Sequence, residues 1–174
     1  MDSISNQLEF VYQFTTDESY IPKKLKKNAA IVLRVSGDFD IKVDGISYFR
    51  DDIALLEFYL YLERWLAIIE SDKYDIPEFH YYTLEIDEDE PLISIIPFDN
   101  NDKVRLTSIW RKEPFDPVFK MDYIVNQLTE LRDQLKKDIE AHYNISVEPF
   151  IDEFPIKALA VVDKKRVRRN GFSH

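Results

Sequence analysis

Apolar and polar residues alternate along residues 30–49, and this period of two constrains the fold more than any other feature of the chain. Such alternation is typical of strands that bury one face and expose the other. If residues 36–38 (Ser-Gly-Asp) form a three-residue turn, Val35 pairs with Phe39, and the apolar side chains on both sides of the turn share one face.

A second turn is predicted at Asp44-Gly45, a dipeptide that favours the type I′ hairpin. This turn pairs Val43 with Ile46 and Ile41 with Tyr48, again on one face. A slip of one residue would break the match. Residues 30–49 are therefore predicted to form a three-stranded antiparallel meander.

The remaining elements predict an α+β fold in which antiparallel sheets are covered by two main helices. The helices are expected at residues 52–71, capped by Asp51 or Asp52, and at 117–144, with Asp116 as N-cap and Pro117 as the first helical residue. Further strands are expected at residues 8–15, 78–87, 91–98, 103–110, 147–152 and 156–162.

The first of these helices is apolar on two sides. One apolar stripe runs through Leu55, Phe58, Tyr59, Leu62, Trp65, Leu66 and Ile69, and a second through Ile53, Leu56, Leu60 and Ala67. A helix that is apolar nearly all round is buried on more than one side. The second stripe is therefore expected either to pack inside the protein or to meet a partner.

Length and composition predict one compact domain. The chain has 174 residues, of which 45% are apolar, and this is enough to bury a core without disulfides. Residues 1–162 are expected to form the domain, and residues 163–174 a basic and mobile tail. There is no cysteine, no apolar run long enough for a membrane span and no secretory signal, so a cytoplasmic protein is expected.

Charge is distributed unevenly along the chain. Residues 38–102 contain 18 acidic and four basic residues, a net charge of −14, whereas residues 163–174 carry +4. An acidic middle section argues against nucleic acid as the main ligand, because affinity for phosphates comes from cations. It favours solubility and, if there is a partner, a basic protein.

The motifs of common enzyme classes are absent. The glycines are isolated, so no phosphate-binding loop is present, and no catalytic-serine or zinc-protease motif occurs. His80, His142 and His174 lack the spacing of metal ligands, and residues 38–45 place glycine at the wrong position for a calcium loop. We therefore expect no enzyme activity, no cofactor and no metal.

The candidate contact residues lie in the densest run of acidic residues and in the turn that follows it. They are Glu85, Asp87, Glu88, Asp89, Glu90, Asp99 and Asp102. Such a run is most often a solvated loop, but it also suits docking of a basic protein. Binding of a divalent cation or a glycosidic substrate is a third interpretation, without specific spacing to favour it.

With these elements placed, the chain resembles the small acidic immunity proteins of Gram-positive bacterial polymorphic-toxin systems. The resemblance lies in residues 30–70, where the segment IVLRVSGDFDIKVDGISYF runs directly into the aromatic helix ALLEFYLYLERWL. It implies a cytosolic inhibitor that masks the active site of a toxin, often a basic nuclease. The basic tail departs from that pattern.

We therefore predict a non-enzymatic protein-binding module that neutralises a toxin through an acidic surface. Two alternatives remain. One is a structural protein that self-associates through the second stripe of the first helix, so that a homo-oligomer forms. The other is a carboxylate-based hydrolase that uses the acidic run.

Overall fold

The protein has an α+β fold, as predicted, in which two antiparallel sheets pack against two main helices. The computed structural model describes residues 4–5, 7–72, 74–83 and 89–152. The predicted strand at 156–162 and the basic tail at 163–174 lie outside these residues.

The seven strands form two separate sheets. The three-stranded sheet has the order β1-β2-β3 and contains β1 (Leu8–Phe14), β2 (Ser36–Val43) and β3 (Ile46–Ala54). The four-stranded sheet has the order β4-β5-β6-β7 and contains β4 (Phe79–Tyr81), β5 (Ile93–Phe98), β6 (Lys103–Ser108) and β7 (Val118–Lys120). Every neighbouring pair is antiparallel.

Two long helices complete the core, α2 (Leu55–Ser71) and α3 (Met121–Tyr143). The shorter helices are η1 (Glu18–Tyr20), η2 (Lys23–Leu25), α1 (Ala29–Val32) and α4 (Glu148–Ile151). None of the helices within the described residues is both long and apolar enough to cross a lipid bilayer.

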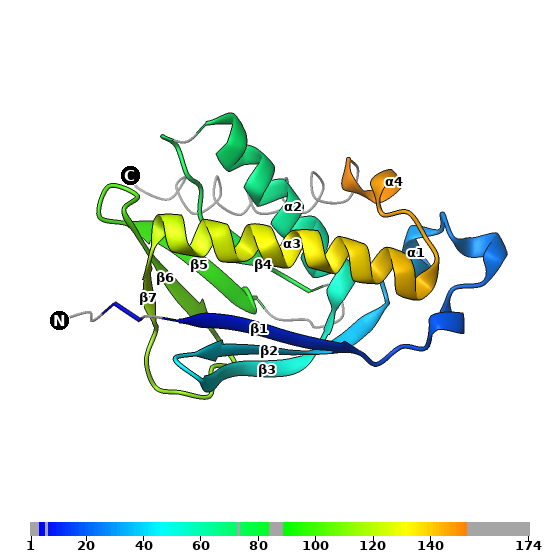
Figure 1. Ribbon diagram of the computed structural model, residues 1–174, viewed down its shortest axis with the longest axis horizontal. Helices are drawn as coiled ribbons and strands as arrows, with labels where there is room; N and C mark the ends of the chain where they lie inside the picture. The colour runs from blue at the N-terminus through cyan, green and yellow to red at the C-terminus, as the bar shows by residue number, and fades with distance from the viewer. Residues whose placement is uncertain (1–3, 6, 73, 84–88, 153–174) are drawn as a thin grey trace, which may run out of the picture.

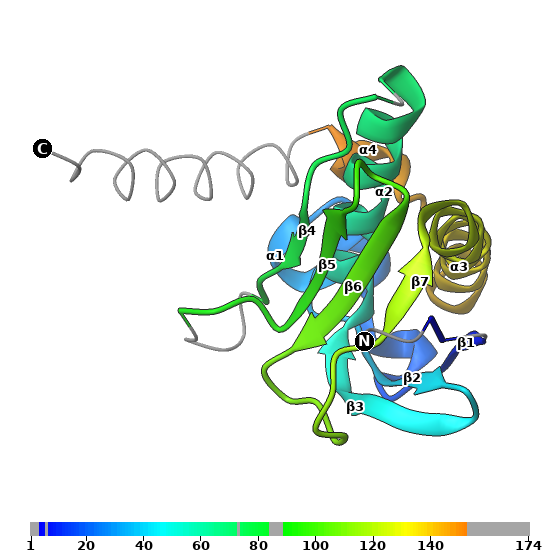
Figure 2. The same ribbon diagram turned by 90° about the vertical axis from the view of Figure 1, so that its left-hand side faces the viewer.

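Helix α2 lies at the centre of this arrangement. Figure 1 shows α3 running along the three-stranded sheet with α2 above it, and Figure 2 shows the four-stranded sheet in front of α2. Eleven of its residues are buried, including Leu56 and Leu60 of the second stripe. Because the protein itself covers these two side chains, the predicted self-association surface is not available on this helix.

The predicted three-stranded meander at residues 30–49 is wrong in its first strand, and this segment supplies only β2 and β3 to the sheet. Residues 29–32 form α1, whose N-terminus is capped by the side chain of Asn28. Val32 and Val35 are fully buried, and this spacing of three suits a helical turn better than alternation. The first strand of the sheet instead comes from the N-terminus, because β1 pairs with the whole of β2.

Gly37 lies within β2 rather than in a turn. A Cβ atom at this position would lie 2.4 Å from Leu55 Cδ1 and 2.6 Å from the carbonyl oxygen of Gln13. The glycine is therefore required by close packing between β1, β2 and the start of α2.

The turn at Asp44-Gly45 is confirmed, with positive φ at both residues and Val43 opposite Ile46. A register shift after Ile41 places this residue opposite Phe49, not opposite Tyr48 as predicted. The hydroxyl of Tyr48 reaches the other sheet, where it lies 3.4 Å from the carbonyl oxygen of Leu106 in β6 and donates at 2.9 Å to Asp116 in the loop before β7. The irregularity thus links the two sheets.

Both long helices begin later than predicted, because strands occupy their expected first turns. β3 continues to Ala54, so neither Asp51 nor Asp52 caps α2, and the amide of Leu55 donates to Val35 instead. β7 likewise separates Asp116 from α3, which has Lys120 at its N-cap. The C-terminal end of α3 is as predicted, with Asn144 in the left-handed conformation.

The strands predicted at residues 8–15, 78–87, 91–98 and 103–110 are confirmed with shorter bounds, whereas residues 148–151 form helix α4 instead of the strand predicted at 147–152. Pro97 lies in β5 beyond the segment that pairs with β4. Because no strand lies beside it on the β4 side, its lack of an N–H removes no hydrogen bond there.

Candidate partner-binding site

The seven predicted contact residues do not form one cluster. Glu85, Asp87 and Glu88 lie outside the described residues, whereas Asp89 and Glu90 are exposed just before β5. Asp99 and Asp102 lie beyond the opposite end of this strand. Six residues of strand span about 20 Å, so the two groups lie at opposite ends of the sheet.

Lysines accompany the two aspartates of the β5–β6 turn. Asp99 pairs with Lys103 at 3.2 Å, and Asp102 pairs with Lys120 at 2.9 Å. The hydrogen bond that Lys120 donates, and then its positive charge, hold the pKa of the Asp102 carboxyl below its ordinary value. Lys103 and Lys120 therefore offset much of the negative charge that the sequence predicts for this turn.

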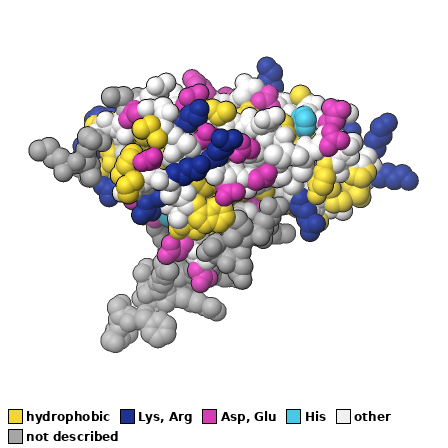
Figure 3. All heavy atoms as spheres, turned by 90° about the horizontal axis from the view of Figure 1, so that it is seen from below, with side chains coloured by type: hydrophobic (Ala, Val, Ile, Leu, Met, Phe, Trp, Pro, Cys, Tyr) yellow, Lys and Arg dark blue, Asp and Glu magenta, His cyan; other side chains and the backbone are white. Residues whose placement is uncertain are grey.

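The three-stranded sheet is not uniformly negative either. Asp38 pairs with Arg50 at 2.8 Å, and the buried Asp40 accepts a hydrogen bond of 2.7 Å from the hydroxyl of Ser47. Figure 3, which views the molecule from below Figure 1, shows basic side chains interspersed among acidic ones on this side. Composition alone therefore does not create a continuous acidic face here.

The loop between α2 and β4 presents a different surface. Tyr74 has 94% of its area exposed, and Asp72 and Asp75 beside it are exposed as well. The backbone of Tyr74 is held at both polar atoms, since its amide donates to Asp72 and its carbonyl accepts from the side chain of Asn101. A large aromatic side chain thus projects into solvent from an anchored loop, between two carboxylates.

Sequence reasoning missed this loop, although one signal was present. The segment 71–75 (Ser-Asp-Lys-Tyr-Asp) places one aromatic residue among polar ones directly after a helix. The hydrogen bond from Asn101 brings this segment against the β5–β6 turn, and hence against the predicted residues Asp99 and Asp102.

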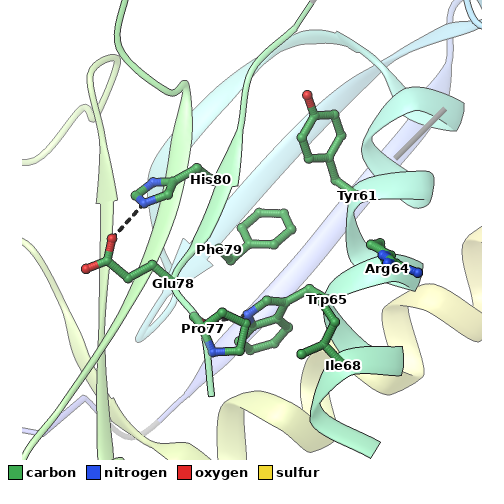
Figure 4. Close-up of a pocket in the computed structure, with 8 residues that line it drawn as sticks. All are labelled: Tyr61, Arg64, Trp65, Ile68, Pro77, Glu78, Phe79 and His80. Carbon is green, nitrogen blue, oxygen red and sulfur yellow. Dashed lines mark hydrogen bonds and ion pairs between the residues drawn. The ribbon is translucent and has the colours of Figure 1, made fainter. Parts of the chain in front are cut away.

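A small recess opens between α2 and β4, close to this loop (Figure 4). We call it the α2–β4 recess. It has a volume of about 60 Å³ and apolar walls formed by Tyr61, Trp65, Ile68, Pro77 and Phe79. Two side chains of α2 also bind the ends of β4: the indole N–H of Trp65 donates to Pro77 at 2.9 Å, and the hydroxyl of Tyr61 donates to Tyr82 at 3.1 Å.

Three polar side chains complete the lining of the recess: Arg64 from α2, and Glu78 and His80 from β4. The imidazole of His80 lies 2.8 Å from the Glu78 carboxylate through Nε2 and 2.8 Å from the Ser94 hydroxyl through Nδ1. Ser94 lies directly opposite His80 on β5. This chain of contacts fixes the orientation of Glu78 at the rim.

Glu78, His80 and Ser94 are the residue types of a hydrolytic triad, but their placement does not suit catalysis. A nucleophile must be reachable by a substrate. Ser94 is only 4% exposed and does not line the recess. The hydroxyl therefore orients the imidazole, and the arrangement is structural.

The size of the recess limits what can enter it. Sites for small metabolites and cofactors have volumes of about 300–1,000 Å³. A volume of about 60 Å³ is well below this range and suits the end of one side chain. Among the described residues, no group of three or more acidic or histidine side chains is placed to hold a metal ion.

Comparison with known proteins gives one match. No curated protein and no solved structure matches the chain. Residues 10–141, which begin within β1 and end within the last turn of α3, match a domain of unknown function, DUF7878. Because this match covers more than half of the chain, the protein belongs to the DUF7878 family.

Proposed function

We propose that this protein is a non-enzymatic protein-binding module, and specifically a cytosolic immunity protein that neutralises a basic toxin domain. The surface we propose for binding is the end of the molecule where the α2–β4 loop meets the β5–β6 turn. This replaces the acidic run at 85–90 as the main candidate contact.

The exposure of Tyr74 is the observation that carries the proposal. Tyrosine is enriched among the residues that dominate binding energy, because it supplies a large contact area with few rotatable bonds. A monomeric domain gains nothing in stability from a tyrosine that is 94% exposed. Asp72 and Asp75 on either side are suited to pair with cations of a basic partner and to speed its approach.

The size of the α2–β4 recess supports binding of a protein rather than turnover of a metabolite. Since it accepts only the end of one side chain, it suits a contact within a larger interface. The resemblance of residues 30–70 to immunity proteins supports the identity of the partner as a toxin.

Capture of the partner from the native source tests the proposal. The tagged protein is expected to retain one basic protein in stoichiometric amount. That protein should arrest growth when produced alone, and co-production of the present chain should restore growth. The double variant Asp72→Lys/Asp75→Lys and the single variant Tyr74→Ala are each expected to lose capture and protection.

A matched control makes the same change of charge elsewhere. Glu9 on β1 and Glu130 on α3 are both exposed, so Glu9→Lys/Glu130→Lys should keep capture and protection. Recovery without a stoichiometric basic partner, or equal loss in both double variants, would overturn the proposal.

A further inference from the structure

The segment from η1 to α1 is strongly basic, although the chain as a whole has a net charge of −10. Residues 19–37 contain five basic residues and no acidic one, namely Lys23, Lys24, Lys26, Lys27 and Arg34. None of the five forms an ion pair with any residue that the structure describes. We call residues 19–34 the basic lobe.

The basic lobe has a defined conformation that turns its cations outward. Ile21 and Val32 are buried and anchor the lobe in the core. Between them, the backbone N–H of Asn28 donates to the carbonyl of Leu25 at 3.0 Å, and the Asn28 side chain caps α1. The cations that are exposed as a result are Lys23, Lys24, Lys27 and Arg34.

The lobe and the β5–β6 turn lie at opposite ends of α3. At the C-terminal end of this helix, the hydroxyl of Tyr143 donates to the carbonyl of Thr16 at 3.1 Å, close to η1. At the N-terminal end, the amide of Met121 donates to the carbonyl of Asp102 at 2.9 Å. A helix of 23 residues is about 34 Å long, whereas charges are screened over about 8 Å at physiological ionic strength. The carboxylates of the turn therefore do not neutralise the lobe.

Three carboxylates border the lobe, and two of them already accept hydrogen bonds. Asp17 accepts from the amide of Glu18 at 2.8 Å and from the hydroxyl of Ser19 at 2.7 Å, and Asp52 accepts from the hydroxyl of Thr15 at 2.8 Å. Even with Asp17 and Glu18 included, residues 17–37 have five basic and two acidic residues, a net charge of +3. The lobe therefore remains positive.

Apolar side chains accompany the cations. Tyr20 is 39% exposed, and Pro22 beside it is exposed as well. Figure 1 shows this part of the chain, in blue, projecting at the right-hand end of the molecule, and Figure 3 shows basic side chains next to an apolar patch at the same end. The surface thus combines positive charge with apolar contact area on a projecting end.

An anionic lipid bilayer matches this combination. Clusters of four to eight cations bind anionic lipids, and tyrosine favours the boundary between headgroups and acyl chains. A projecting end can reach a flat surface while the acidic body of the protein stays away from it. Four of the five cations are lysines, which act as flexible point charges and suit mobile headgroups better than the fixed carboxylates of a folded partner. Single-stranded RNA fits less well, because Tyr20 offers only one ring for stacking.

We infer that the basic lobe docks the protein on the surface of an anionic phospholipid bilayer, with its lysines over the headgroups and Tyr20 at their lower boundary. This inference goes beyond the proposed function and does not depend on it. In this orientation the loop that carries Tyr74 faces away from the bilayer, since Asn101 holds it against the β5–β6 turn at the other end of α3.

Sedimentation of the full chain with lipid vesicles tests the inference. Vesicles of phosphatidylcholine with about 30% phosphatidylglycerol should bind the protein at about 0.1 M salt, and pure phosphatidylcholine vesicles should not. Binding should be lost at about 1 M salt, where the screening length falls to about 3 Å.

Two triple variants separate the lobe from charge in general. Lys23→Gln/Lys24→Gln/Lys27→Gln should weaken vesicle binding about 100-fold, since each lysine at a bilayer contributes about fivefold. Arg64→Gln/Lys112→Gln/Lys137→Gln removes three exposed cations outside the lobe and should retain binding within about fivefold. Retained dispersion of the amide NMR spectrum confirms that each variant is folded.

The orientation on the bilayer is measured by NMR with lipid nanodiscs of the same composition. A few headgroups that carry a gadolinium chelate should broaden the amide signals of Tyr20 and of residues 23–27. The amide signals of Tyr74 and Asn101 should stay sharp.

Four results would overturn the inference. They are equal binding to pure phosphatidylcholine vesicles, equal loss of binding in the two triple variants, broadening at Tyr74 instead of the lobe, and tighter binding of a soluble polyanion than of vesicles at equal charge. The polyanions used are polyglutamate and a single-stranded RNA oligonucleotide. Preference for polyglutamate would assign the lobe to an acidic protein, and preference for RNA to a nucleic acid.

Discussion

The side-chain amide of Asn101 donates a hydrogen bond of 3.2 Å to the carbonyl oxygen of Tyr74. This contact ties the turn between β5 and β6 to the loop between α2 and β4. It holds the backbone beneath the most exposed large hydrophobic side chain among the described residues. The presentation of Tyr74 therefore depends on a residue 27 positions away in the chain.

Removal of this hydrogen bond is expected to loosen the loop without unfolding the protein. Asn101 has a positive φ of 65°, so Asn101→Gly removes the amide while keeping the backbone conformation accessible. We expect faster hydrogen exchange at Tyr74 and Asp75, and a loss of about 1 kcal/mol or less in the free energy of unfolding. Asn100→Gly, at the neighbouring position with φ of 54°, should leave exchange in the loop unchanged.

Gly37→Ala is expected to destabilise the fold strongly. The new methyl group would meet the Gln13 carbonyl, which belongs to the paired backbone of β1 and has no room to retreat. Overpacking of this kind costs about 1–3 kcal/mol, measurable by chemical denaturation. Gly45→Ala faces open space and a φ of +82°, so only the backbone strain of about 1–2 kcal/mol applies there. A Gly37→Ala variant as stable as the original protein would refute the close approach.

Alkaline pH is expected to unfold the protein through its tyrosines. Burial is the main cause that raises the pKa of six tyrosine hydroxyls, namely Tyr12, Tyr48, Tyr59, Tyr61, Tyr81 and Tyr143. Hydrogen bonds to carboxylates add to the effect at Tyr12, which donates to Asp138, and at Tyr48, which donates to Asp116.

The sign of this dependence follows from the direction of the shifts. A folded pKa above the unfolded value of about 10 stabilises the protein fully below pH 10, and this contribution is lost as pH rises through the folded pKa. Tyrosinate absorbance from these residues should therefore appear together with the loss of circular dichroism. Complete titration near pH 10 with the dichroism intact would contradict the prediction.

Lys120→Met is expected to raise the pKa of Asp102 towards the ordinary value of about 3.9. The pKa is low because Lys120 donates a hydrogen bond to this carboxylate and because its charge is nearby. A depressed carboxyl pKa stabilises the fold above the unfolded pKa, and this contribution is lost as pH falls through the folded value. Carbon NMR titration of the carboxyl group measures the shift. Lys42→Met on β2 should leave the pKa of Asp102 unchanged.

Local patterns predicted several elements well. The apolar stripe of α3 and the end of this helix at Tyr143 follow from spacing along one segment, as does the hairpin turn at Asp44-Gly45. Each of these depends on interactions between residues close in sequence, which periodicity and turn chemistry describe directly.

Residues 29–35 show where such patterns fail. Their alternation fits a strand, but β1 already pairs with β2 along its whole length, so no place in the sheet remains for them. The sequence places Gly37 in a turn for the same reason, because its actual neighbours, Gln13 and Leu55, approach it only in the folded protein. Competition among distant segments for one pairing position is invisible in a window of sequence.

The sequence by itself determined the fold class, the two long helices and the excess of carboxylates between residues 38 and 102, because composition and periodicity are properties of the chain. Only the tertiary structure decided which carboxylates meet lysines, which tyrosine faces solvent and where a recess opens. Those outcomes depend on segments far apart in the chain, such as α2 and β4 or Tyr74 and Asn101, coming into contact when the core is buried.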